Sequence, residues 1–432
     1  MKTIFIFLIF IVQIFPQTQN KIPWPSLANS PWPTLRGDMQ ATGRSEFVGP
    51  ETLNIKWMGD YPLGIIEGPV IGYGNKLFFG TDALNNIGEN YFYAVNPDSS
   101  LFWRYVTNNS WPNSVAPLIT KDSTIIFFAN TGELYALDYY GNLKWKKYVT
   151  NHYMQPSIDL EGNIYVTSTD TLKVLKQDGS ELLTKYFEKI QTRISFSPNG
   201  QTLYFLSGSI YFNATDLQGN IKWRIKFNSA FSNQASPLVD NVGNIYLSGM
   251  DTLRRPHFFS VSDQGIIRWK YPVFLEQFSE PCIDNEGNII LAGKTFDTSY
   301  VLSDTNYIIS LDYYGNLNWK YALGEDDEPN SGMVCDAKGN IFFGATWGTY
   351  FQALDKNGKL LWKLPLKGYE YDTSPSIGSD GTLYIGLHIS TFFRDHKDNL
   401  IAIGKTPVNV EDENIKVDEF SLSQNYPNPF NP

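Results

Sequence analysis

The chain has 432 residues and a formal net charge of −10 at pH 7, with 34 Lys and Arg against 44 Asp and Glu. Such an acidic composition argues against nucleic-acid binding, which needs cationic side chains to displace counterions from phosphate. The 34 Gly and 24 Pro supply turns, the 26 Tyr, 29 Phe and 11 Trp favour strands, and no long stretch has the period of an amphipathic helix. The sequence therefore predicts an all-β protein.

The first twenty residues have the layout of a secretory signal peptide. Met1-Lys2 is a short positive end, residues 3–15 are almost continuously apolar, and residues 16–20 are polar. The apolar run is too short to span a membrane comfortably, and no Cys follows it that could carry a lipid anchor. We expect residues 1–20 to be removed and the mature chain, without a membrane span, to be extracellular or on the cell surface, with the periplasm as the alternative. The cleavage position stays open.

Residues 21–48 form a lead-in segment rich in Pro and Trp, which we expect to be irregular and to pack over the domain that follows. Residues 53–57 (LNIKW) then resemble the last strand of a repeat whose earlier strands are missing at this point.

The repeat is clearest in residues 136–145 (ALDYYGNLKW), which return as 310–319 (SLDYYGNLNW) and 353–362 (ALDKNGKLLW). Alternating apolar residues on both arms, with Asp and Gly at the turn, predict a β-hairpin. A second half precedes it, with Pro, a strand, a turn with Gly and another strand, as in residues 156–166 (PSIDLEGNIYV) and 281–291 (PCIDNEGNIIL). Together the halves predict four antiparallel strands, A to D.

Strand D recurs at intervals between 38 residues (145 to 183) and 50 residues (269 to 319), which is the spacing of four-stranded propeller blades. The last unit stops after its third strand, at residues 400–403, and residues 53–57 supply the missing fourth. We therefore predict an eight-bladed β-propeller over residues 49–404, closed by the N-terminal strand 53–57. The repeat tryptophans are expected to be packing residues: Trp57, Trp103, Trp145, Trp223, Trp269, Trp319 and Trp362. Leu183 stands at the equivalent position of a degenerate unit.

The decapeptide resembles the repeat of the quinoprotein-like, or PQQ-repeat, β-propellers, over roughly residues 30–404. That family includes quinone-dependent dehydrogenases, the lipoprotein of outer-membrane barrel assembly and secreted proteins without known activity. The resemblance implies that the repeat Trp docks between blades. It implies a catalytic site only where a vicinal Cys pair, a Trp floor and a calcium-binding Asp/Glu/Asn set are present. Cys282 and Cys335 are far apart in sequence, so PQQ and calcium are not expected here.

The C-terminal residues predict a linker, 405–419, followed by a Pro-rich tail, 420–432. The tail (FSLSQNYPNPFNP) resembles the opening of the C-terminal sorting domain read by type IX secretion systems of Bacteroidota-like bacteria, although such domains continue for many tens of residues. The resemblance implies the type IX machinery as a partner if the domain is complete.

Three other candidate sites have simpler interpretations. The Asp-x-x-Gly turns lack the dozen-residue ligand spacing of calcium loops and are expected to be hairpin turns. The four histidines are too dispersed for a metal site, so no metal is predicted. Cys282 and Cys335 fall on equivalent strands of adjacent units, where they are either bridged or two buried thiols.

The loops that the repeats do not share indicate where a ligand could bind. The B–C and D–A loops emerge on one face, because strand direction alternates within a blade. The long B–C insertions are residues 81–90, 250–257, 294–306 and 387–398. Aromatic and acidic side chains gather in or near these loops: Glu67, Trp111, Tyr153, Glu276, Phe278, Glu280, Asp326, Asp327, Trp347, Tyr369, Glu370, Tyr371 and Asp372.

Aromatic rings beside carboxylates suit sugars, basic peptides or cations. The favoured hypothesis is a monomeric, non-enzymatic binding module with a glycan or protein ligand on this face. The alternatives are an enzyme, either a PQQ-dependent dehydrogenase or a polysaccharide-active propeller, and a scaffold in envelope assembly.

Overall fold

The structure is a computed structural model, and it describes residues 17–61, 65, 67–81, 91–107, 116–129, 131–149, 154–227, 235–275, 279–324, 327, 331–344, 350–366, 369–370, 374–389 and 399–405. The predicted signal peptide up to residue 16, most of the predicted linker and the sorting-like tail lie outside these residues.

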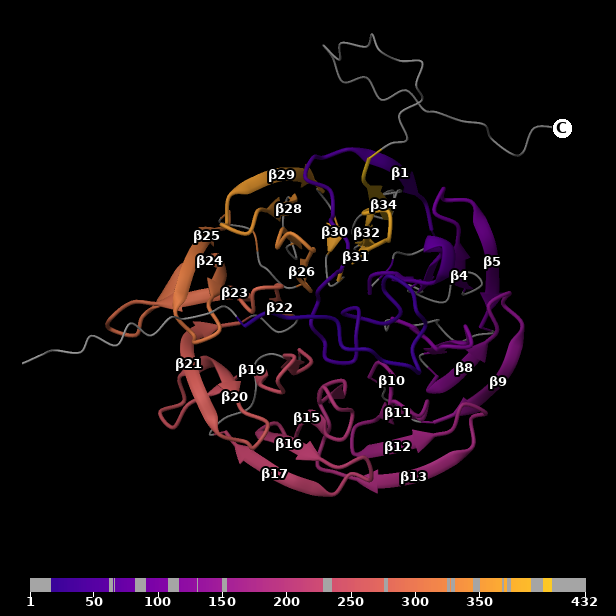
Figure 1. Ribbon diagram of the computed structural model, residues 1–432, viewed down its shortest axis with the longest axis horizontal. Helices are drawn as coiled ribbons and strands as arrows, with labels where there is room; N and C mark the ends of the chain where they lie inside the picture. Colours follow the sequence, from indigo (N-terminus) through magenta and orange to yellow (C-terminus); the bar gives the residue numbers. More distant parts are fainter. Residues whose placement is uncertain are drawn as a thin grey trace, which may run out of the picture.

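The described chain contains no α-helix and is a β-propeller, with sheets arranged around a common axis (Figure 1). Its antiparallel strands come in consecutive sets of four: β2(Val70–Ile71), β3(Leu77–Gly80), β4(Tyr91–Val95), β5(Leu101–Val106); β6(Leu118–Ile119), β7(Ile125–Phe128), β8(Glu133–Leu137), β9(Leu143–Tyr148); β10(Ser157–Ile158), β11(Ile164–Thr167), β12(Thr171–Leu175), β13(Glu181–Tyr186); β14(Ser195–Phe196), β15(Leu203–Ser207), β16(Tyr211–Thr215), β17(Ile221–Lys226); and β26(Val334–Cys335), β27(Ile341–Phe343), β28(Tyr350–Leu354), β29(Leu360–Pro365).

Two sets join in one larger sheet, because β21 pairs with β23 through Val273 and Thr295. They are β18(Leu238–Val239), β19(Ile245–Met250), β20(Pro256–Val261), β21(Ile267–Phe274), and β22(Cys282–Ile283), β23(Ile289–Phe296), β24(Leu302–Leu311), β25(Leu317–Ala322). Outside the sets are a two-stranded antiparallel sheet, β30(Tyr369–Glu370) with β33(His388–Ile389), and the 3₁₀ turn η1(Tyr73–Asn75).

One further sheet combines the two ends of the described chain. Its order is β1(Ile55–Gly59), β34(Leu400–Ile403), β32(Leu383–Gly386) and β31(Ser376–Ile377). Trp57 of β1 lies opposite Ala402, in the same register as Trp145 opposite Ala136 in a continuous set. The N-terminal strand therefore takes the outermost position of a sheet whose other strands end the domain.

Burial follows the position of a strand within its set. The first three strands are apolar runs buried on both sides by neighbouring sheets, as in β7 (IIFF). The fourth strands are outermost, and in β9 (LKWKKY) exposed residues alternate with half-buried ones. This difference is why strand D alone has an alternating sequence.

Each repeat Trp connects its own sheet to the next one. The Trp145 Nε1 donates to the Gln177 carbonyl at 2.7 Å. Gly179 of that turn has φ 81°, and a Cβ added to it would come within 3.0 Å of the Trp145 ring, so the position needs a glycine. The same indole-to-carbonyl bond is made by Trp57 to Pro97, Trp103 to Tyr139, Trp223 to Asp263, Trp269 to Tyr313, Trp319 to Lys356 and Trp362 to Pro50.

The Asp of the turn holds the loop that receives the indole. The Asp138 carboxylate accepts hydrogen bonds from the backbone N–H groups of Tyr140 and Asn142, both at 2.9 Å, and from the Asn142 side chain. The decapeptide is thus one device, in which Asp shapes the turn, Gly admits the neighbouring ring and Trp reaches the following turn.

The degenerate unit replaces the missing indole with a tyrosine. Leu183 has no polar group to reach Leu217, which occupies the receiving position in the next turn. The Tyr165 hydroxyl lies 3.3 Å from both the Leu217 carbonyl and the Asp159 carboxylate, either of which can accept its hydrogen, and Lys185 packs against Gly219. A surface groove of about 560 Å³ borders this junction, lined by Tyr186, Phe187, Gly219 and other residues.

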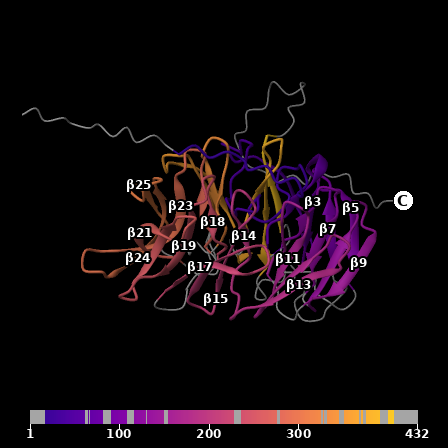
Figure 2. The ribbon, with the colours of Figure 1, turned by 60° about the horizontal axis from the view of Figure 1, so that its bottom comes forward.

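The lead-in segment crosses the ring on the face that carries the A–B turns (Figure 2). Trp32, Arg36, Met39 and Gln40 are at most 1% exposed. The inner strands donate backbone hydrogen bonds to it: Ile71 to Trp32, Ile119 to Pro33, Phe196 to Met39, Val239 to Gln40, Ile283 to Thr42 and Cys335 to Gly43. The lead-in segment is therefore part of the core. It was expected to pack over the domain, and it is buried more deeply than that.

We predict that Trp362→Ala lowers the free energy of unfolding by about 3–5 kcal/mol, because it removes a buried ring and leaves the Pro50 carbonyl unpaired. Leu183→Ala, at the position without an indole, is the matched control and should cost less than half as much. Urea titration followed by tryptophan fluorescence and circular dichroism measures both. Equal losses would contradict a special role for the indole contacts.

Candidate functional site

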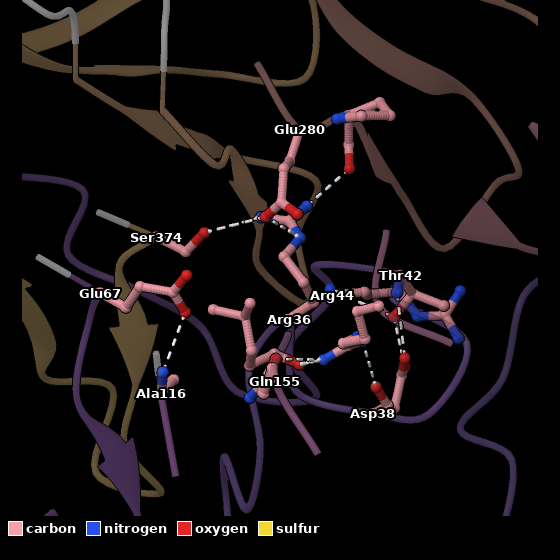
Figure 3. Close-up of polar contacts among 12 residues, drawn as sticks. Arg36, Asp38, Thr42, Arg44, Glu67, Ala116, Gln155, Glu280 and Ser374 are labelled. Carbon is pink, nitrogen blue, oxygen red and sulfur yellow. Dashed lines mark hydrogen bonds and ion pairs between the residues drawn. The ribbon is translucent and has the colours of Figure 1, made fainter. Parts of the chain in front are cut away.

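A buried polar cluster lies where the inner strands of different sets converge (Figure 3). We call it the axial cluster and define it as Arg36, Glu67, Gln155, Arg193, Glu280 and Ser374. Gln155, Arg193, Glu280 and Ser374 occupy the same repeat position, immediately before the Pro or Ile that precedes an inner strand. Arg36 comes from the lead-in segment. The cluster therefore assembles from residues up to 338 positions apart.

Arg36 is the centre of one half of the cluster. Its guanidinium is 1% exposed and lies 3.4 Å from the Glu280 carboxylate, measured from Nε. Its other nitrogens donate to the Pro281 carbonyl at 2.6 Å and to the Ser374 hydroxyl at 3.5 Å. The Ser374 hydroxyl donates to Glu280 at 3.3 Å. This charge is thus paired and hydrogen-bonded, as a buried charge must be.

Arg193 is bonded differently, because its hydrogen bonds go to neutral acceptors. Its terminal nitrogens donate to the Leu35 carbonyl at 2.8 Å, the Gln155 side-chain oxygen at 2.9 Å and the Asp38 carbonyl at 3.1 Å. Burial lowers the pKa of Arg193 to about 10, although Glu280 and Asp38 nearby oppose the shift. The Arg193 Nε and the Gln155 amide nitrogen are both buried without a partner. These two donors are the unsatisfied part of the cluster.

The two glutamates are the part of the cluster that solvent reaches. Glu67 and Glu280 are half-buried, whereas Arg36, Gln155 and Arg193 are at most 3% exposed. The Glu67 carboxylate accepts a hydrogen bond from the Ala116 backbone at 3.0 Å. From solvent inward, the cluster therefore presents acceptors first and then donors.

Asp38 fixes the bend of the lead-in segment beside Arg193. Its carboxylate accepts hydrogen bonds from the Gln40 and Thr42 backbone, at 3.1 and 3.0 Å, and from the Thr42 hydroxyl. The bend places the Asp38 carbonyl against Arg193 and carries the chain onward to Arg44. Burial lowers the pKa of Arg44, whose guanidinium donates to the Asn20 carbonyl at 2.8 Å.

The structure describes only some of the residues that were predicted to form the binding face. Glu67 and Glu280 come together in the axial cluster. Asp327 is 3% exposed, and its carboxylate accepts a hydrogen bond from the Gly324 backbone at 3.3 Å, so it stabilises its own turn. Tyr369 and Glu370 lie on β30, and their side chains are outside the description. The remaining candidates lie outside the described residues: Trp111, Tyr153, Glu276, Phe278, Asp326, Trp347, Tyr371 and Asp372.

Two of the predicted insertions are described, and they lengthen hairpins. Residues 250–257 join β19 to β20, and residues 294–306 join β23 to β24. They touch through His257 and Tyr300, whose ring nitrogen and hydroxyl are 3.2 Å apart, and Arg255 stacks on the Tyr300 ring at 4.4 Å. Burial lowers the pKa of His257. The two insertions therefore pack against each other, although they belong to neighbouring sets.

Four residues of the axial cluster were not predicted from the sequence: Arg36, Gln155, Arg193 and Ser374. The last three could have been found by aligning the residue that precedes each inner strand, where polar side chains replace Gly and Ala. Arg36 lies in a segment that does not repeat, so no such alignment reaches it.

The described residues contain no group of three His, Cys, Asp or Glu side chains placed to hold a metal ion. Nor does this part of the chain contain a helix long and apolar enough to cross a membrane. On the lead-in face, a hollow of about 690 Å³ is lined by Pro23, Trp24, Pro25, Pro33, Tyr73 and neighbouring residues.

Fold and cluster together define a β-propeller with a polar site on its axis. No protein-family model matches the chain, and a search of curated proteins finds no significant match. Among solved structures, BamB from Moraxella catarrhalis is similar at 12% identity, with a TM-score of 0.59, over 82% of this chain and 99% of that one. A streptogramin B lyase matches at 12% identity with a TM-score of 0.45, over 66% of this chain and 90% of the other. The likeness to BamB supports the propeller fold.

We predict that Glu280→Gln lowers the free energy of unfolding by about 3 kcal/mol, because Arg36 would stay buried without its carboxylate. The double variant Arg36→Met with Glu280→Leu should cost less than the sum of its single variants. Glu46→Gln, in an exposed 2.7 Å pair with Lys21, is the matched control and should change stability by less than about 0.5 kcal/mol. Additive effects of the Arg36 and Glu280 substitutions in urea titrations would contradict the pairing.

Proposed function

We propose that this chain is an exported, non-enzymatic β-propeller that binds a protein or glycan partner on the face of the D–A and B–C loops, with the axial cluster at the centre of the contact. The observation that supports this most directly is the pair of buried, unpartnered donors, Arg193 Nε and Gln155 Nε2. Leaving a buried donor unsatisfied costs roughly 1–3 kcal/mol, and a ligand acceptor that paired with these two donors would recover that cost.

The order of polar groups indicates the chemistry of the ligand. A group entering the cluster meets the half-buried carboxylates of Glu67 and Glu280 first, and they accept hydrogen bonds. It then meets Gln155 and Arg193, which donate them. A peptide unit, an amide side chain or a sugar ring with several hydroxyls offers both donors and acceptors. Such a neutral polar group matches the cluster better than a simple cation or anion does.

We further propose that the ring has eight blades and is closed by β1. Counting the seven consecutive sets together with the sheet that β1 completes gives this number, and the series of indole contacts supports it. Trp362 bonds to Pro50, and Trp57 bonds to Pro97, so the contact between neighbours continues across the junction of the two chain ends. The domain limits of residues 49–404, the signal peptide before residue 21 and the sorting-like tail from residue 420 belong to the same proposal.

The proposal includes export to the cell surface or medium, type IX secretion if a complete sorting domain follows, and a monomeric state. Binding of the partner is proposed to need neither PQQ nor calcium, since the sequence lacks the vicinal Cys pair of the quinone enzymes. Two alternatives are kept. An envelope-assembly scaffold would be retained in the periplasm, and a polysaccharide-active or quinone-dependent enzyme would turn over its substrate.

The decisive variant is Gln155→Glu. Its carboxylate would accept from Arg193 as Gln155 does, but it replaces the unpartnered donor by an acceptor and adds a negative charge to the axial cluster. We expect the melting temperature to stay the same or rise, while affinity for the partner falls at least tenfold, or about 1.4 kcal/mol. Binding is measured with the full mature chain on protein and glycan arrays, followed by titration calorimetry with the best ligand from either array.

The control variant is Glu286→Gln. Glu286 lies in an A–B turn, on the face opposite the D–A and B–C loops, and its substitution breaks an exposed ion pair with Lys356. It should bind like the original chain. Unchanged binding by Gln155→Glu would show that the axial cluster is not the contact. Turnover of a polysaccharide, or dye reduction after addition of PQQ and calcium, would replace the binding function by one of the enzymatic alternatives.

A further inference from the structure

The two cysteines meet in the core of the ring. Cys282 lies on β22 and Cys335 on β26, the inner strands of two neighbouring sets. Both side chains are fully buried, and their Sγ atoms are 2.7 Å apart. Non-bonded heavy atoms usually pack at about 3.5–4.0 Å, and a disulfide bond is about 2.05 Å long. The sulfurs are therefore closer than ordinary packing brings two side chains.

The approach of the two strands is fixed by the lead-in segment. Ile283, next to Cys282, donates its backbone N–H to the Thr42 carbonyl at 3.1 Å. Cys335 donates to the Gly43 carbonyl and accepts from the Ser45 backbone, both at 2.8 Å. One short stretch of chain thus holds both cysteine-bearing strands, so the sulfurs meet without movement of either sheet.

The two sulfurs lie among apolar side chains. Their neighbours in the core include Ile290, Ala292, Met333 and Ile341. Burial raises the pKa of the Cys335 thiol well above its usual value, and the adjacent Cys282 adds to the effect. The Cys335 thiolate, the form that would attack a disulfide, is therefore scarcely formed once the ring has folded. A bond between these cysteines has to form before burial is complete, and it is then protected from reductants.

We propose that Cys282 and Cys335 are oxidised to a disulfide that connects the two neighbouring sheets across the core of the ring. During folding after export, the thiolate of one cysteine attacks the disulfide of a thiol oxidoreductase, forming a mixed disulfide. The second cysteine displaces the enzyme's thiol. Two protons and two electrons pass from the cysteine pair to the oxidoreductase, which leaves as a dithiol. The bond closes a loop between positions 53 residues apart and restrains the unfolded chain.

The test is an alkylation experiment on the full chain purified from an oxidising compartment. The protein is unfolded in guanidinium with N-ethylmaleimide, with or without prior reduction, and its intact mass is measured. We expect no maleimide without reductant, a mass lower than that of the reduced chain by two hydrogens, and two maleimides after reduction. Two maleimides on the unreduced chain would overturn the proposal.

A second measurement separates the bond from its effect on the fold. We expect the melting temperature of the unreduced chain to fall by at least about 3 °C after reduction in the unfolded state and refolding in reductant. The matched control, Cys282→Ala with Cys335→Ala, should melt at the same temperature with and without reductant. An equal change in melting temperature of both proteins on reduction would overturn the stabilising role of the disulfide. Whether the bond exists is decided separately, by the intact mass. Neither readout depends on the proposed binding function.

Discussion

The contact between a tryptophan and the turn of the next sheet is the interaction on which the ring depends. An indole has one donor and a broad apolar face. The receiving turn offers one carbonyl and, opposite Trp103, Trp145, Trp223, Trp269 and Trp319, a glycine with no side chain in the way. Because the donor belongs to strand D and the acceptor to the segment before strand D of the next sheet, each contact links two successive sheets. The inner strands then bury both of their faces without any helix to cover them.

The lead-in segment adds a second kind of connection, from the centre of the ring. It meets inner strands of several sets through backbone hydrogen bonds, and it carries Arg36 into the polar cluster and Thr42 to Gly43 against the cysteine-bearing strands. The outer contacts repeat because the same sequence recurs. The central ones differ from set to set, since one irregular segment has to match them all.

The propeller fold was predictable because its causes are local: the Asp and Gly of a turn and the Trp of a strand lie within ten residues, so one repeat contains the whole signal. The pairing of residues 53–57 with residues 400–403 followed from a missing strand. The axial cluster was only half predictable. Glu67 and Glu280 were found as acidic loop residues, but the importance of Arg193 and Gln155 comes from convergence around an axis. Tyr165 was also missed, because its reach to Leu217 depends on how neighbouring sheets are spaced.

The pairing of β1 with β34 sets the order in which the chain can fold. Individual hairpins have only local contacts, but the outer strand of the last sheet lies near the start of the chain, and the lead-in segment needs partners from residue 71 to residue 335. Such long-range contacts slow folding, because the entropy of closing the chain is lost before they form. The last sheet cannot be completed until residues 400–403 have been synthesised, so β1 lacks its native partner while most of the chain is being made.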